Sequence, residues 1–174
     1  MKNLIVLFTL CIPLGLFAQS SVQKEAVGFI SFNEGKVLSL AVKFTDEQYN
    51  WRPAEGVRSV QESLLHVAAG NFMFMQVAGF TLPEGLDPWT LEKNVTGKTN
   101  VIETVRSSYA FLKDGILKIG NEQLGDVVTF PFPGEYTKLS AIMLGVDHTS
   151  EHLGQLIAYA RMNGVTPPWS EGGN

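Results

Sequence analysis

The chain contains very little cysteine. Among its 174 residues the single cysteine is Cys11, which lies in the apolar N-terminal run. If that run is removed, the mature chain has no disulfide, no thiol nucleophile and no cysteine metal ligand. The stability of the mature protein must then come from packing of its core, with a contribution from any metal that other side chains hold.

The chain also lacks an excess of basic residues. It has 13 Lys and Arg against 17 Asp and Glu, a formal net charge of −4, and no basic run. This balance argues against nucleic acid and against anionic lipid surfaces as partners. The sequence contains neither a glycine-rich phosphate loop nor a nucleophile-elbow serine, so those two kinds of active site are not expected.

The N-terminus has the pattern of a secretory signal peptide. A basic start at Lys2 is followed by apolar residues 4–17 and then by Ala18, a small residue suited to cleavage. A membrane anchor needs about 20 apolar residues, and this run is shorter and is interrupted by Pro13 and Gly15. We therefore expect residues 1–18 to be a signal peptide, no stable membrane anchor, and export to the periplasm or the medium.

Residues 19–174 are expected to form one domain, because four segments have helical periodicity and no internal repeat is present. Four helices of about twenty residues with two longer connections predict an all-α protein, an up-and-down four-helix bundle with long connecting loops. The predicted helices cover residues 22–42, 59–78, 100–119 and 137–162.

Local signals mark several helix ends. Ser59 with Glu62 is a capping-box pattern, and Asn100 with Glu103 is a weaker one. Residues 163–164, Asn-Gly, predict the end of the last helix. Residues 125–134 predict an extended segment that its prolines keep out of any central strand. The tryptophans fall in loops, where they either rim a pocket or clamp helix ends.

The three histidines of the chain carry the main functional signal. His148 and His152 are four residues apart in the last predicted helix, which places them on one face about 6 Å apart. They share that face with Ala141, Gly145, Gln155 and Tyr159. His66 lies in the most apolar predicted helix, where an unpaired imidazole would be costly. The alternative is three unrelated histidines, but the shared interior face favours one metal site.

Three neutral imidazoles suit zinc, nickel, copper or ferrous iron and leave a coordination position for water or substrate. An ion held by neutral ligands keeps its full charge and acidifies a bound water or thiol. We therefore predict His66, His148 and His152 as the ligands of a divalent transition metal, with zinc, nickel or iron favoured.

The string from His148 to His152 also reads as H-x-x-E-H, an inverted zincin protease signature. That mechanism needs a further acidic ligand downstream, and Glu171 is the only later carboxylate. The protease interpretation is therefore disfavoured. Glu151 is interpreted as a general base, as a residue that orients a ligand, or as a solvated side chain.

Three segments together resemble the DinB/YfiT-like superfamily, and they cover essentially the whole of 19–174 in order. The segments are YNWRP at 49–53, ESLLHVA at 62–68 and HTSEHLGQLIAYARMNGV at 148–165. The resemblance implies a four-helix bundle with His66, His148 and His152 as metal ligands, and a homodimer.

The resemblance also implies a range of activities. Relatives include thiol-dependent transferases and isomerases in which the metal activates a thiol, and many are described as metal-dependent hydrolases. We therefore expect a metal-dependent hydrolase or thiol-dependent transferase acting on a small-molecule substrate. The alternative, from another class, is a non-catalytic metal-stabilised bundle that binds a ligand or serves as a scaffold.

Overall fold

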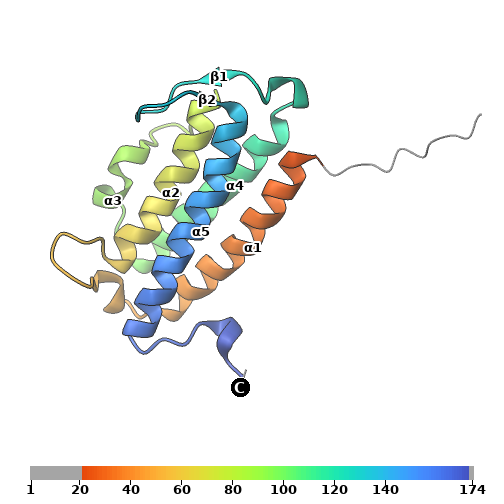
Figure 1. Cartoon of the computed structure of the whole chain (residues 1–174). Helices are drawn as coiled ribbons and strands as arrows, with labels where there is room; N and C mark the ends of the chain where they lie inside the picture. Colours follow the sequence, from red (N-terminus) through yellow and green to blue (C-terminus); the bar gives the residue numbers. More distant parts are fainter. Residues whose placement is uncertain (1–20, 173–174) are drawn as a thin grey trace, which may run out of the picture.

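The computed structural model describes residues 21–172, and these form a four-helix bundle with a short extra helix and a small hairpin (Figure 1). The all-α fold class is confirmed. The predicted signal peptide and Cys11 lie outside the described residues. Within the described residues, no helix has the length and apolar character needed to cross a membrane. The helices are α1 (Val22–Lys43), α2 (Val60–Val77), α3 (Leu91–Asn94), α4 (Lys98–Lys118) and α5 (Lys138–Met162).

The long helices contact one another in the cyclic order α1, α4, α2, α5. Asn71 of α2 bonds Ser108 of α4, and one turn later Met75 lies against Gly115, so these two neighbours run parallel (Figure 1). Helices α1 and α5 are also parallel, since they end together where the Gln48 amide donates to the carbonyl of Asn163. The up-and-down arrangement predicted from the sequence is therefore wrong.

The connection between α2 and α4 explains this arrangement. Residues 78–97 link the end of α2 to the start of α4. A connection of that length can span about 65 Å, roughly twice the length of a 21-residue helix, so the chain returns to the far end of the bundle before α4 begins. There Lys98 donates to the carbonyls of Val42 and Phe44 at 2.8 and 2.7 Å, which satisfies the C-terminal end of α1.

Helix ends follow the sequence signals in part. The capping box is confirmed, because the Ser59 hydroxyl accepts from the Glu62 amide while the Glu62 carboxylate accepts from the Ser59 amide. The weaker capping box predicted at Asn100 and Glu103 is wrong. Helix α4 begins after Gly97, which has φ 84°, and Asn100 is already helical, with its side-chain Nδ2 donating to the Thr96 carbonyl.

The extended segment predicted at 125–134 forms only a two-residue strand. Strand β1 (Val127–Val128) pairs antiparallel with β2 (Tyr136–Thr137), directly before α5. The turn between them carries Pro131 and Pro133, which lack the N–H groups needed for a longer ladder. The hairpin therefore lies at one end of the bundle, above the ends of α2 and α5 (Figure 1).

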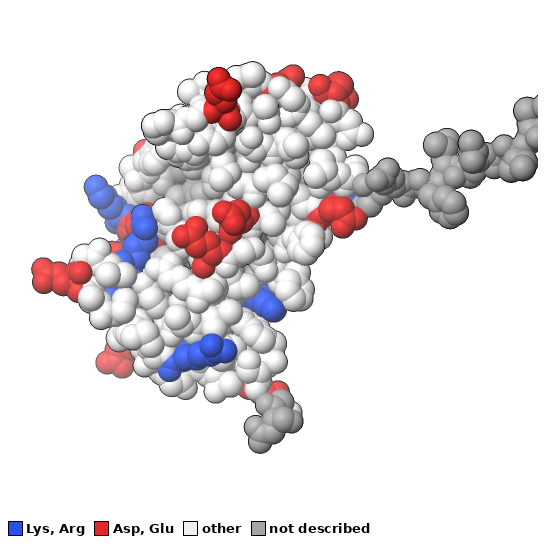
Figure 2. Space-filling view, in the orientation of Figure 1, with Lys and Arg blue, Asp and Glu red and all other residues white. Residues whose placement is uncertain are grey.

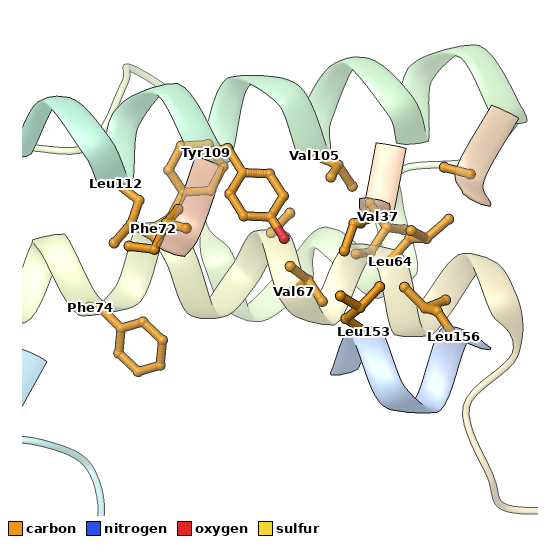
Figure 3. Close-up of a cluster of buried hydrophobic side chains, with 14 of the residues drawn as sticks. Val37, Leu64, Val67, Phe72, Phe74, Val105, Tyr109, Leu112, Leu153 and Leu156 are labelled. Atoms are coloured by element: carbon orange, nitrogen blue, oxygen red, sulfur yellow. The ribbon is translucent and has the colours of Figure 1, made fainter. Parts of the chain in front are cut away.

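The core lies between the four long helices and is formed by their apolar faces (Figure 3). Phe72, Leu64 and Val67 of α2 are fully buried. Phe74 is also buried, but in Figure 3 it points to the opposite side of α2 from Phe72, away from α4. This placement brings Phe74 to the side of the molecule where α2 faces α5.

Candidate metal centre

The three histidines meet between α2 and α5. His66 comes from α2, and His148 and His152 come from successive turns of the antiparallel α5. One ring nitrogen from each lies within 4.8 Å of the others, and the three ring centroids are 4.4 to 5.1 Å apart. Nitrogen ligands of a tetrahedral ion at about 2.1 Å lie about 3.4 Å apart, so small inward movements of the rings suffice to bring the ligands together.

His66 is held by a charged anchor. Its Nδ1 lies 3.0 Å from Oε1 of Glu92 in α3, and Nε of Arg58 lies 3.1 and 3.0 Å from the two oxygens of the same carboxylate. The carboxylate is an acceptor only, so the neutral His66 ring carries its proton on Nδ1. Its Nε2 then has a free lone pair, as a metal ligand requires.

His152 is held by a neutral anchor. Its Nδ1 lies 2.7 Å from Oε1 of Gln155, and Nε2 of Gln155 donates to the Tyr159 hydroxyl at 2.8 Å. That hydroxyl in turn donates to the backbone carbonyl of Arg58 at 3.1 Å. The direction of this chain fixes the Gln155 carbonyl oxygen toward His152, so the His152 ring also donates from Nδ1. Trp51 packs edge-on against Tyr159 and holds it in place.

His148 has no polar anchor. Its Nδ1 is buried and has no hydrogen-bond partner among the described residues. The ring packs edge-on against Phe74 at a centroid distance of 5.4 Å. It also lies so close to Gly70 that a Cβ there would be 2.7 Å from Nδ1, so a larger residue at this position of α2 would force the ring to move. A buried ring nitrogen without a partner is costly, and a metal ion would satisfy it.

The electrostatics of the site favour neutral imidazoles. Burial lowers the pKa of His148 to about 3, with further lowering by the neighbouring His152, His66 and Arg58. Burial also lowers the pKa of His66, and Arg58 and His152 act in the same direction, while Glu92 opposes them. Unprotonated rings are the form that binds metal, so the donor set fits a divalent transition ion.

A cavity of about 530 Å³ adjoins the cluster, and His66 and His148 line it. Its other walls come from α2, from the loop that carries Trp89, from α3 with Glu92, and from the hairpin turn with Phe132. Asp147 and Glu151 of α5 also line it and are exposed, and Figure 2 shows acidic side chains over the middle of α5. The volume lies in the range typical of small-molecule sites.

The structure brings together all three histidines that the sequence singled out. Glu151 lines the cavity, but the histidine anchors are Glu92 and Gln155. Glu171 lies beyond the end of α5 and pairs instead with Lys43 at the end of α1, at 3.0 Å, and it is not part of the histidine cluster. The H-x-x-E-H protease interpretation is therefore left without its acidic ligand.

Some features of the site were missed by the sequence analysis. Gly145 lies on the helix that carries His148 and His152, and Leu112 and Phe74 pack against it. Arg58 and Glu92 were not predicted. They lie in connections, and no local pattern marks them, since their role depends on how the loops fold back onto α2.

Comparisons with known proteins give the same fold. The family model described as the DinB superfamily matches residues 30–156. A crystal structure of a DinB-like protein from Bacillus cereus has a TM-score of 0.68 at 16% identity, covering 81% of this chain and 94% of that one. A DinB-like protein from Bacillus subtilis has a TM-score of 0.64 at 22% identity, with 82% and 93% covered.

A third structure, of a conserved protein from Enterococcus faecalis, has a TM-score of 0.66 at 19% identity, covering 83% of this chain and 98% of that chain. In a sequence comparison, no curated protein matched the chain. At these identities the solved structures establish the fold and not the activity.

Proposed function

Because the chain belongs to the DinB superfamily and its histidines converge beside a cavity, we propose that it is a metal-dependent hydrolase or thiol-dependent transferase. His66, His148 and His152 would hold one divalent transition-metal ion, with zinc, nickel or iron favoured. The observation that carries the proposal is the convergence of three histidine ring nitrogens from two helices next to a cavity large enough for a small molecule.

Each part of the site has a role in this proposal. A bound divalent ion supplies a Lewis acid that makes a water or thiol nucleophilic near neutral pH. Glu92 and Gln155 orient two of the ligand rings through their Nδ1 protons. Glu151 lines the cavity and is the candidate to accept a proton from the attacking group. The apolar walls exclude water around the reacting atoms.

The alternative is a non-catalytic bundle in which metal only stabilises the fold. Structural metal sites are closed by protein ligands, whereas this cluster has three ligands and adjoins a cavity that also contains a carboxylate. That difference favours the enzyme. A survey of ester, amide and thiol-conjugation substrates with metal-loaded protein separates the two, since an enzymatic activity must disappear in His148→Ala.

Metal analysis tests the site itself. Protein purified from its native compartment should carry about one equivalent of zinc, nickel, iron or copper per chain. His66→Ala should lose most of that metal, while Trp169→Ala, a change to an exposed side chain near the C-terminus, should keep it. Full metal occupancy in His66→Ala would overturn the proposed site.

We also propose export and a homodimer. Export rests on the pattern of residues 1–18 and is tested by fractionating cells that express the full chain, since retention of an unprocessed chain in the cytosol contradicts it. The homodimer is supported by α1, where Phe29 and Phe32 are 61% and 62% exposed. Sedimentation equilibrium should give twice the chain mass, and a monomer at micromolar concentration overturns this proposal.

A further inference from the structure

Much of the lining of the cavity beside the histidines is apolar. Met73 and Phe74 of α2, Leu144 of α5 and Phe132 of the hairpin turn contribute to this apolar lining, together with Trp89. These side chains offer only the Trp89 indole N–H as a donor and the Met73 sulfur as a weak acceptor. A ligand in the cavity therefore meets carbon over much of its surface.

The aromatic residues of this lining pack against the core. Phe132 stacks on Phe130 with ring centroids 5.0 Å apart and an interplanar angle of 26°. Phe130 is buried and contacts Phe74 at 6.2 Å, and Phe74 in turn packs against His148. Tyr136 packs edge-on against both hairpin phenylalanines. We call Phe74, Phe130, Phe132 and Tyr136 the aromatic wall.

The aromatic wall connects the hairpin to the metal cluster. Two of its members, Phe74 and Phe132, line the cavity, and the other two hold them in place. Side chains that are already held in place lose little conformational entropy when a ligand packs on them. Flat rings prefer stacked or edge-on contact with such surfaces, and burying them removes a large apolar area from water.

The charges that line the cavity are mostly negative. Glu92, Asp147 and Glu151 contribute carboxylates, and the single cation among the lining residues, Arg58, is already bonded to Glu92. A bound metal ion would offset part of this negative charge, but its positive charge is taken up by the metal-binding atom of the ligand. A ligand tail that carries a further carboxylate would face Asp147 and Glu151, with no free cationic side chain in the lining to pair with it. An uncharged or cationic tail meets no such penalty.

We propose that this cavity binds the ring-sized apolar part of an uncharged or cationic substrate, with its metal-binding atom directed toward the histidines. The inference rests on the proposed metal function and names the substrate class of the same site. It disfavours thiols that carry carboxylate groups as co-substrates and favours esters, amides or thioethers with an aromatic or similarly flat group.

Hydroxamates provide the probe, because their two oxygens bind zinc while the attached group can be varied. The zinc-loaded full chain is titrated with acetohydroxamate and with benzohydroxamate by calorimetry. We expect benzohydroxamate to bind at least tenfold more tightly, because its ring is buried on the aromatic wall whereas the methyl group reaches little of it.

Two variants of Phe132 test where the phenyl ring of benzohydroxamate binds. Phe132→Ala should weaken the affinity for benzohydroxamate at least fivefold and change the affinity for acetohydroxamate by no more than about twofold. Phe132 is 39% exposed, so the variant should fold, and Phe132→Leu keeps the apolar bulk and should give an intermediate loss. The matched control is Trp169→Ala, which removes a ring that is 40% exposed, near the C-terminus and outside the cavity lining, and should leave both affinities unchanged.

A second pair of probes tests the charge. Benzohydroxamate with a para-aminomethyl group should bind at least tenfold more tightly than the para-carboxylate form at low salt. Asp147→Asn should narrow that ratio, while Glu103→Gln, an exposed acid of α4 outside the cavity lining, should not. Equal affinities of the two probes would overturn the charge preference.

The outcomes separate this inference from the proposed function. If acetohydroxamate binds the loaded protein and benzohydroxamate binds no more tightly, the metal site stands and the aromatic substrate class is wrong. If neither hydroxamate binds and metal analysis finds no zinc, the proposed function fails and this inference fails with it. Loss of the preference for benzohydroxamate in Trp169→Ala would place the phenyl ring of the probe elsewhere and also contradict the proposal.

Discussion

Two histidines of the cluster are positioned differently from the third. His66 and His152 each donate from Nδ1 to a side-chain oxygen, one from a carboxylate and one from an amide. His148 has a buried Nδ1 with no partner and is positioned by the close approach of Gly70 and Phe74. Polar anchors fix which nitrogen carries the proton, whereas packing fixes only where the ring lies.

This difference means that the three ligands should respond to different perturbations. The anchored rings should be sensitive to loss of a hydrogen-bond acceptor, and the packed ring should be sensitive to volume and to acid. The following experiments test that separation, beginning with the largest expected effect.

Acid should destabilise the metal-free protein through His148. The pKa of this ring is lowered by burial to about 3 in the folded chain, from an ordinary value of 6.5. Between those values the unfolded chain binds a proton that the folded chain does not, so the free energy of unfolding falls as pH falls. The contribution approaches about 1.4 kcal/mol per pH unit below pH 6.

Urea unfolding at pH 7, 6, 5 and 4 measures this slope. His148→Asn removes the titrating ring, so its slope should be smaller by nearly one proton, while the carboxylates contribute equally to both proteins. Identical slopes in the two proteins would show that His148 becomes protonated readily in the folded chain.

A methyl group at Gly70 should displace the packed ring. The Cβ of Gly70→Ala would collide with His148, and overpacking of this kind costs about 1 to 3 kcal/mol of unfolding free energy. Zinc affinity should fall as well. Gly154→Ala on α5 is the control, because nothing lies within 4 Å of its Cβ position and alanine favours a helix. If both variants are equally stable, Gly70 is not required for the approach of His148.

Removing the charged anchor should weaken metal binding without unfolding the bundle. Glu92→Ala takes away the acceptor of His66, and loss of such a partner costs about 10- to 100-fold in metal affinity. Glu92→Gln keeps an oxygen acceptor and should lose less. Glu84→Ala, an exposed acid in the same connection, is the control, and competition with a fluorescent chelator gives the affinities. Equal affinities in Glu92→Ala and Glu84→Ala would contradict the anchor.

The neutral anchor should give the smallest effect. Tyr159→Phe removes the hydroxyl between Gln155 and the Arg58 carbonyl, which should cost about 1 kcal/mol of stability and a few-fold in zinc affinity. Tyr136→Phe removes an exposed bond to the Pro133 carbonyl and should change stability by less than about 0.5 kcal/mol. A zinc affinity that is unchanged in Tyr159→Phe would show that Gln155 holds its orientation alone.

The sequence predicted those parts of the molecule that depend on local periodicity. The four long helices, the Ser59 cap and the end of α5 follow from apolar spacing and capping residues, because these interactions span only a few positions. The three histidines could be selected because a spacing of four places two rings on one helix face.

The parts that depend on distant contacts were not predictable in the same way. The parallel packing of α2 with α4 is set by a long connection whose path no local pattern specifies. Glu92 reaches His66 only because α3 folds back against α2, and Arg58 joins them from another loop. Periodicity describes each helix separately and carries no information on which loop residue will lie beside it.

Arg58 takes part in both polar anchors, with its guanidinium bonded to Glu92 and its backbone carbonyl accepting from Tyr159. One residue just before α2 therefore braces a ligand on each of two helices. A change in the length of the 51–59 segment would loosen both rings together, although it alters no ligand and no contact inside the bundle. For anyone redesigning this protein, the length of that short stretch should be kept.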